Sequence, residues 1–244
     1  MNDSPFEDRL CAGRHLAKEL ACSELPPDGI VVALAPGGVP VGYEVANRLH
    51  LAFDVMAARR IAVPWQREIT IGAVVGAEHV LDEELINTMG ISACELAEIV
   101  PDEVESGARE NALYHRHCAA LDVCGRPVIV VDDGLATGDT MLAALRFIRR
   151  ARPSLLVAAA PVGPLGAFAR LQNEADRVVC VQSLQHFCTI GEHYRRYDLI
   201  GAVEIQKLLL ASRRQWLRAK AFALPDDAPS HPSSSVRPNN APQR

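Results

Sequence analysis

An apolar run that ends in two carboxylates and a loop of small residues constrains this chain more than any other stretch. Residues 128–131 are Val-Ile-Val-Val, Asp132 and Asp133 follow, and a loop with Gly and Thr leads to Met141. A continuous run of β-branched residues is typical of a parallel strand covered on both faces. After the loop, apolar side chains recur at helical spacing up to about residue 150. The stretch therefore predicts a strand, a loop and a helix in direct succession.

The loop of this unit is a candidate phosphate cradle. Amides in the first turn of a helix have no partner within the helix, and the helix dipole is positive there, so such a loop can surround a phosphate with N–H groups and hydroxyls. Asp132 and Asp133 lie where ligands bind in open α/β sheets, at the carboxyl end of the strand. Two neighbouring aspartates alone could simply end a generic strand, but the loop composition and the flanking periodicity favour a site. The predicted cradle comprises Ala136, Thr137, Gly138, Asp139 and Thr140.

The rest of the chain repeats this alternation of strands and helices. The form Ser4-Pro5-Phe6-Glu7 predicts a capping box at the start of a first helix. Alternating strands and helices predict an α/β fold with a doubly wound, mainly parallel sheet. A looser, charged region at about 62–126 indicates an insertion, and the polar, Pro- and Ser-rich composition from residue 224 predicts a disordered tail over 224–244, after one domain over 1–223. Further strands are expected at 30–34, 53–58, 69–75, 155–162 and 177–181, and further helices at 41–49, 165–171 and 202–220.

Charge and cysteine content narrow the class of protein. The net charge of −5 at pH 7 disfavours a general attraction to nucleic acid or to anionic membranes. The seven cysteines are odd in number and form no C-x-x-C pair, which is typical of reduced thiols in a cytosolic protein. Neither a signal peptide nor an apolar run of roughly 18 residues is recognisable. We expect a cytoplasmic protein with no nucleic-acid partner and no membrane partner.

The stretch 128–141 resembles the signature of the type I phosphoribosyltransferases, which bind 5-phosphoribosyl 1-diphosphate (PRPP). The resemblance extends over roughly residues 6–210, through segments such as 37–41, 71–74 and 160–162, to a bacterial branch of predicted phosphoribosyltransferases. It implies the type I fold, with residues 62–126 as a flexible hood, and a homodimer. It also implies that Asp132 and Asp133 hold the ribose hydroxyls, directly or through Mg²⁺, and that residues 136–140 hold the 5′-phosphate.

The same resemblance implies a diphosphate site formed by Pro36, Gly37, Gly38, Arg59 and Arg60. Glycine permits close approach of backbone N–H groups to an anion. Taken alone, the glycine loop could be a plain turn and the arginine pair a solvated strand end. Their positions at the ends of neighbouring predicted strands favour the site. Negative charge gathers on the departing diphosphate during displacement at the anomeric carbon, and Mg²⁺, arginines and amides there lower the barrier.

Three residues depart from the family pattern. Pro36 stands where many relatives carry arginine, which removes a cation and a backbone donor. Asp139 stands where a small residue is usual, and a carboxylate about 4 Å from a phosphate costs roughly 1 kcal/mol in water and about 4 kcal/mol at an effective dielectric near 20. We expect its side chain to point to solvent. Ala136 replaces the aspartate of the 6-oxopurine enzymes, which argues against hypoxanthine or guanine as the acceptor.

Other polar and aromatic residues are weaker candidates. Phe187, Tyr194 and Tyr197 follow the last predicted core strand, where the family builds its acceptor pocket, and core packing is an equally good interpretation. A general acid or base could lie among the hood residues, although a charged helical surface is the plainer interpretation of each. No catalytic residue is assigned, and the spacing of the His115-Arg116-His117-Cys118 run argues against a metal site there. The hood candidates are Asp102, Glu103, Glu105, Glu110 and Tyr114.

The favoured hypothesis is a Mg²⁺-dependent phosphoribosyltransferase that uses PRPP and an unidentified nitrogenous acceptor. The alternative from another class is a sensor that keeps the PRPP or nucleotide pocket without turnover, which the proline at position 36 and the lack of an evident base support. A third hypothesis is a phosphohydrolase or phosphorylase that acts on a phosphorylated pentose, because the same cradle would bind its substrate.

Overall fold

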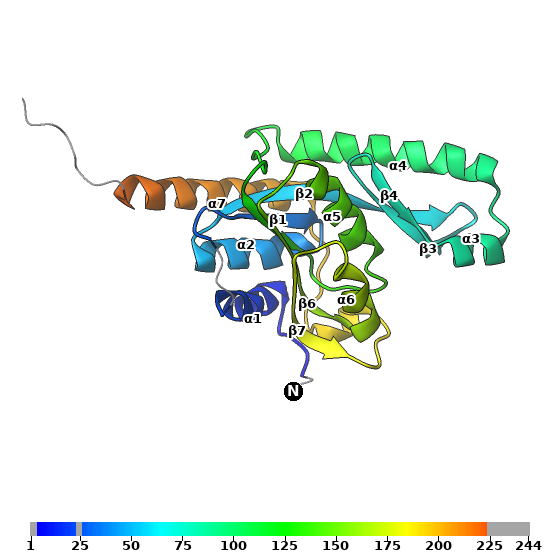
Figure 1. Ribbon diagram of the computed structural model, residues 1–244, viewed down its shortest axis with the longest axis horizontal. Helices are drawn as coiled ribbons and strands as arrows, with labels where there is room; N and C mark the ends of the chain where they lie inside the picture. Colours follow the sequence, from blue (N-terminus) through cyan, green and yellow to red (C-terminus); the bar gives the residue numbers. More distant parts are fainter. Residues whose placement is uncertain (1–3, 23–25, 224–244) are drawn as a thin grey trace, which may run out of the picture.

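A seven-stranded mixed sheet forms the centre of the computed structural model, which describes residues 4–22 and 26–223 (Figure 1). The strand order is β4-β3-β2-β1-β5-β6-β7, and the run from β2 to β7 is parallel, while β3 and β4 are antiparallel additions at one edge. This confirms the predicted α/β fold with a mainly parallel sheet. The strands are β1 (Ile30–Ala35), β2 (Ala52–Val63), β3 (Gln66–Val75), β4 (Glu78–Leu81), β5 (Pro127–Val131), β6 (Leu155–Pro164) and β7 (Arg177–Leu184).

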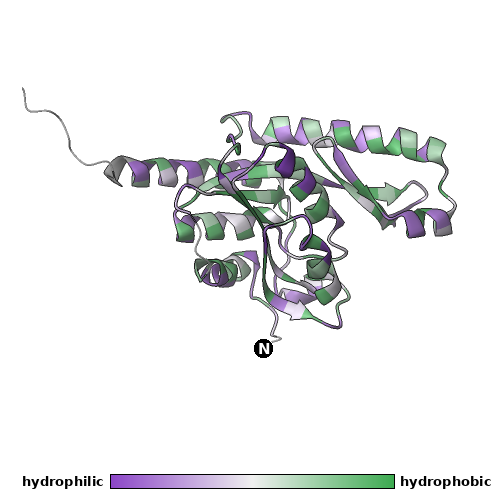
Figure 2. Ribbon diagram, in the orientation of Figure 1, coloured by the Kyte–Doolittle hydropathy of each residue, from purple (hydrophilic) through white to green (hydrophobic). Residues whose placement is uncertain are grey.

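Helices cover both faces of the parallel sheet. Helices α5 and α6 pack with one face, through side chains such as Met141 and Leu145, and α1, α2 and α7 pack with the other, through side chains such as Leu16 and Leu209. Every residue of β1 and of β5 is buried, which explains why both strands are continuous apolar runs. Figure 2 shows strands that are mostly hydrophobic and helices in which hydrophobic and hydrophilic residues alternate. The helices are α1 (Arg9–Ala21), α2 (Gly38–Leu49), α3 (Glu83–Met89), α4 (Ala93–Tyr114), α5 (Asp139–Arg150), α6 (Leu165–Leu171) and α7 (Ala202–Ala223).

The hood, residues 62–126, extends from β2, the strand at the edge of the parallel part of the sheet (Figure 1). It contains the end of β2, then β3, β4, α3 and α4, and Ile71, Ile86 and Ile91 form a separate small core with the end of β2. The long helix α4 begins with a capping box between Ser92 and Glu95. The hood therefore has a hydrophobic cluster of its own.

The start of α1 differs from the sequence prediction. The helix begins at Arg9, and the Asp8 side chain accepts a hydrogen bond from the Cys11 amide at 2.7 Å, so Asp8 rather than Ser4 is the N-cap. The reason lies in tertiary pairing, because Phe6 exchanges backbone hydrogen bonds of 2.8 Å with the segment 193–195. A residue paired in this way cannot join the helix. A short 3₁₀ turn (Ile190–His193) precedes the paired segment.

The predicted disordered tail, residues 224–244, lies outside the described residues. Within the described residues, no helix has both the length and the apolar character that crossing a bilayer requires.

Candidate functional site

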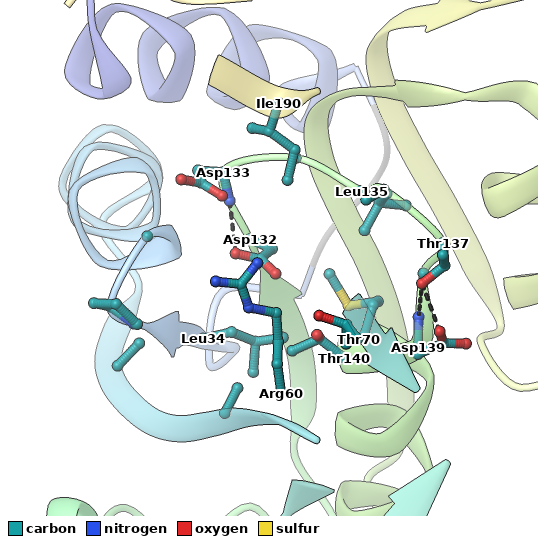
Figure 3. Close-up of a pocket in the computed structure, with 18 of the residues that line it drawn as sticks. Leu34, Arg60, Thr70, Asp132, Asp133, Leu135, Thr137, Asp139, Thr140 and Ile190 are labelled. Atoms are coloured by element: carbon teal, nitrogen blue, oxygen red, sulfur yellow. Dashed lines mark hydrogen bonds between the residues drawn. The ribbon is translucent and has the colours of Figure 1, made fainter. Parts of the chain in front are cut away.

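A cavity of about 390 Å³ lies at the carboxyl ends of β1 and β5, the position that the two aspartates predicted. The N-terminal ends of α2 and α5 both reach it, so two helix dipoles present their positive ends to one space. Figure 3 shows Asp132, Thr137 and Thr140 around this space, with Arg60 projecting into it from β2. Predicted site residues in the lining are Pro36, Gly37, Arg60, Asp132, Asp133, Ala136, Thr137, Gly138, Asp139, Thr140 and Tyr197.

The loop after β1 packs directly on the carboxyl end of β5, and glycine makes this possible. A Cβ atom at Gly37 would lie 2.4 Å from Oδ2 of Asp133, and one at Gly38 would lie 2.6 Å from the carbonyl oxygen of Val131. Both distances are too short for a side chain. Gly38 starts α2 and is not among the described residues that line the cavity. The Ala35–Pro36 peptide bond is cis. The two glycines thus set the distance between the predicted diphosphate loop and the aspartates.

The loop before α5 has the backbone of an anion cradle. Gly138 adopts a φ of 87°, which an L side chain rarely adopts, and so turns the chain into the helix. The amides of Thr137, Gly138 and Thr140 have no protein acceptor among the described residues. The Thr137 hydroxyl, in contrast, donates to Oδ2 of Asp139 at 2.5 Å. The donors left for an anion are therefore the amides and the Thr140 hydroxyl.

The expectation that the Asp139 side chain points to solvent is wrong. Asp139 is 7% exposed, and its Oδ1 accepts a hydrogen bond of 2.9 Å from Nη2 of Arg170 on α6. The physical reason is that Arg170 and the Thr137 hydroxyl give the carboxylate two partners inside the protein, so it does not need water.

The two neighbouring aspartates have different surroundings. Oδ2 of Asp133 accepts from Nε of Arg9 at 2.7 Å and from the Tyr197 hydroxyl at 3.0 Å, and Asp133 is 4% exposed. Asp132 has neither partner, and its Oδ1 accepts the Asp133 amide at 2.9 Å. Burial, and next the charge of Asp133, raise the pKa of Asp132 well above its usual value. Asp132 is thus the carboxyl group of the pair that would gain most from a cation or a hydroxyl donor in the cavity.

Arg9 connects several parts of the site. Its guanidinium lies 3.8 Å from the centroid of the Tyr197 ring and donates through Nη1 to the carbonyl of Asp198 at 2.7 Å. Burial lowers its pKa, but the contact with Asp133 more than compensates, so the pKa of Arg9 is raised overall. Burial has the opposite effect on a phenol and raises the pKa of the Tyr194 hydroxyl, which donates to the carbonyl of Asp133 at 2.5 Å. Arg9 and Tyr197, which both line the cavity, and the buried Tyr194 together hold Asp133 in place.

The structure brings Arg60 to the cavity but not Arg59. Adjacent residues of a strand point to opposite faces, and Arg59 points toward α4. There its Nε contacts Glu103 at 2.8 Å and its Nη1 contacts Glu110 at 2.7 Å. Arg60 has no ion-pair partner in the part of the chain that the structure describes, and it is exposed to the cavity. Arg60 is therefore the free cation of the predicted arginine pair.

Of the predicted acceptor and hood residues, only some reach the cavity. Tyr197 lines the cavity, whereas Tyr194 is buried behind Asp133 and Phe187 stacks on His193 with a centroid distance of 5.1 Å. Phe187 and Tyr194 thus serve packing, the alternative that the sequence left open. None of the hood candidates lines the cavity among the residues described: Glu103 and Glu110 bind Arg59, Glu105 pairs with Arg109, and Tyr114 is buried, while Asp102 is exposed.

The roles of two arginines and most of the cavity wall were not predictable from the sequence. Arg9 lies 124 positions before Asp133, and Arg170 lies 31 positions after Asp139, so local pattern could not pair them. The unusual carboxylate at position 139 is the one signal in the sequence that calls for a cation nearby. Other lining residues that carried no signal of chemistry are Leu34, Ala35, Ala58, Thr70, Gly72, Gly134, Leu135, Met141, Ile190, Leu199 and Ile200.

Comparison with known proteins bears directly on this site. Residues 7–193 match the family model of the phosphoribosyl transferase domain. Two curated relatives from Mycobacterium tuberculosis, of strains CDC 1551 and H37Rv, both carry a provisional phosphoribosyl transferase name. Each is 32% identical over 226 residues, which is 92% of this chain. The chain spans about half the length of these relatives, 51% in each case.

A solved structure is similar over most of its length. The crystal structure of the protein TT1426 from Thermus thermophilus is 32% identical to this chain, with a TM-score of 0.69. The match covers 85% of this chain and 98% of the other.

Proposed function

Since the chain belongs to the phosphoribosyl transferase family, we propose that it transfers the phosphoribosyl group of PRPP to a nitrogenous acceptor and releases diphosphate. One observation carries the proposal. One cavity receives the N-terminal ends of α2 and α5, the carboxyl group of Asp132, and Arg60, which has no ion-pair partner among the described residues. Two separate positive regions and a carboxyl group between them suit a donor with a phosphate at one end and a diphosphate at the other.

The residues take distinct roles in this proposal. Amides of the 136–140 loop hold the 5′-phosphate, and the ribose lies against Asp132. The amides at the start of α2 and the guanidinium of Arg60 face the diphosphate, whose negative charge grows as its bond to the anomeric carbon breaks. Donors that are already oriented before the bond breaks stabilise that charge without reorganisation. Tyr197 and the apolar wall at Ile190, Leu199 and Ile200 border the remaining volume, which suits a planar acceptor.

Mg²⁺ fits the chemistry of this donor set. Magnesium in such sites uses one or two carboxylates together with substrate oxygens. Asp132 offers a carboxylate that burial makes difficult to ionise, and a cation beside it would reverse that cost. Asp133 is the weaker ligand because Arg9 and Tyr197 already occupy its Oδ2. A bound Mg²⁺ would neutralise charge on the diphosphate.

The function is tested by measuring turnover and binding together. The protein is incubated with PRPP, Mg²⁺ and a panel of nitrogenous bases while diphosphate release is followed, and PRPP binding is measured by calorimetry. Release with one acceptor supports the transferase. Binding without release for every acceptor would favour the sensor, and release of inorganic phosphate from a phosphorylated pentose without acceptor would favour a hydrolase. Light scattering tests the homodimer that we also propose.

The arginine pair offers a matched test of the site. Arg60→Met removes the free cation of the cavity, and the loss of a charge-assisted hydrogen bond, about 1.5–3 kcal/mol, corresponds to roughly 10- to 100-fold weaker PRPP binding. Arg59→Met removes the same group from the opposite face of β2 and should leave PRPP affinity within about threefold. Equal losses in the two variants, measured by calorimetry, would contradict the proposed diphosphate site.

A further inference from the structure

Asp139 presents an electrostatic problem for a phosphate cradle. Its backbone belongs to the loop that would surround the phosphate, and its side chain is buried beside that loop. A negative charge so near the loop repels a bound phosphate unless a cation compensates that charge. The site therefore needs a partner for Asp139, and it needs one that leaves the amides of the loop free.

Arg170 supplies this partner through three linked contacts. Its Nη2 lies 2.9 Å from Oδ1 of Asp139, and its Nη1 donates to the carbonyl of Thr137 at 2.7 Å. The Thr137 hydroxyl donates to the other carboxylate oxygen of Asp139. The guanidinium therefore spans the loop from residue 137 to residue 139, and both oxygens of the carboxylate are occupied by the protein. We call these three residues the Arg170 cluster.

The placement of α6 makes the contact possible. Ala167 and Arg170 are three residues apart and so share one face of the helix. A Cβ atom at Gly138 would lie 3.6 Å from the Cβ of Ala167, so this face of α6 packs directly against the turn of the loop. Arg170 reaches past Ala167 to the carboxylate, and its side chain is 48% exposed whereas that of Asp139 is 10% exposed. The cation comes from the outside of the loop, away from the space that the phosphate would fill.

We propose that Arg170 is a positioning residue for phosphate binding, which cancels the charge of Asp139 and holds Thr137 so that the loop amides converge on the anion. The inference deepens the proposed function and rests on it only in requiring that the loop binds a phosphate group. Because Arg170 acts through Asp139, its importance depends on that carboxylate. Without the negative charge at position 139, the cation becomes dispensable for affinity.

The test is a double-mutant cycle with inorganic phosphate as the probe. Arg170→Met leaves the carboxylate uncompensated, and the repulsion corresponds to roughly 5- to 900-fold weaker phosphate binding. Asp139→Asn alone removes the repulsion while Arg170 keeps its charge, so this variant should bind phosphate at least as tightly as wild type. The double variant should recover to within about fivefold of wild type, because both charges are absent. Arg146→Met is the control, since Arg146 forms an exposed ion pair with Glu174 at 2.9 Å on the outer side of α5. It should bind phosphate as wild type does.

Each result decides the proposal. A double variant that binds as weakly as Arg170→Met would show that Arg170 contacts the phosphate directly or merely orders the loop, and would overturn it. Absence of phosphate binding by the wild-type protein would overturn it as well. Urea denaturation of each variant separates loss of folding from loss of affinity, and Arg170→Lys, which keeps the charge, should bind phosphate better than Arg170→Met. Phosphate binding that follows the cycle without any diphosphate release would leave this inference standing and count against the transferase alone.

Discussion

Replacing Arg9 by methionine should destabilise the fold far more than the loss of an ordinary surface arginine. Arg9 is 9% exposed and Asp133 is 4% exposed, and their side chains meet at 2.7 Å. Removing one partner of a buried ion pair leaves an uncompensated charge and typically costs about 3–5 kcal/mol. The Tyr197 hydroxyl at 3.0 Å would still donate to Asp133, so we expect a loss of about 3 kcal/mol in the free energy of unfolding.

The assay is urea denaturation followed by circular dichroism. Arg48→Met provides the matched control, because Arg48 pairs with Glu44 at 3.2 Å on the surface and its side chain is 50% exposed. Such a pair contributes roughly 0–1 kcal/mol. A second variant, Arg9→Met with Asp133→Asn, removes the buried charge as well and should recover about 1–2 kcal/mol of the loss.

Two results would refute this reasoning. Equal free energies of unfolding for Arg9→Met and Arg48→Met would mean that the buried pair contributes no more than a surface pair. A double variant as unstable as Arg9→Met would mean that the cost comes from lost packing on Tyr197 rather than from the unpaired charge of Asp133.

Three further predictions rest on the packing around Gly38 and on the raised pKa values of His115 and Cys180. Gly38→Ala should cost about 1–3 kcal/mol of stability, because its Cβ would lie 2.6 Å from a backbone oxygen at the end of β5, whereas Gly201→Ala, whose Cβ meets nothing within 4 Å, should be nearly neutral in urea denaturation. The hydrogen bond from His115 to Asp54 at 2.8 Å, despite opposing burial, raises the pKa of His115 above 6.5. The stability that His115→Gln loses should therefore be largest below pH 6.5 and shrink as pH rises through the raised pKa, and a pH-independent loss would contradict this. Burial raises the pKa of Cys180 to about 12, so alkylation followed by mass spectrometry should label it more slowly than the exposed cysteines, and equal rates would count against that burial.

Local chemistry made much of the fold predictable. The apolar run 128–131 became β5, the loop after it became the turn into α5, and the predicted helix at 165–171 is α6 with the same bounds. Apolar periodicity and glycine placement act within a few residues, and so they are visible in a sequence. The predicted start of α1 was wrong because the backbone of Phe6 pairs with the segment 193–195. No local pattern in the sequence reveals that pairing.

The sequence by itself determined the strand-loop-helix units and the residues that they deliver to one edge of the sheet, including Asp132 and the 136–140 loop. It also contained the alternation that separates Arg59 from Arg60, although not which of the two faces the cavity. Only the tertiary structure decided that Arg9 binds Asp133 and that Arg170 binds Asp139, because these ion pairs join segments 124 and 31 positions apart. Backbone preference is local, whereas a buried charge takes whichever partner the packing of distant helices brings to it.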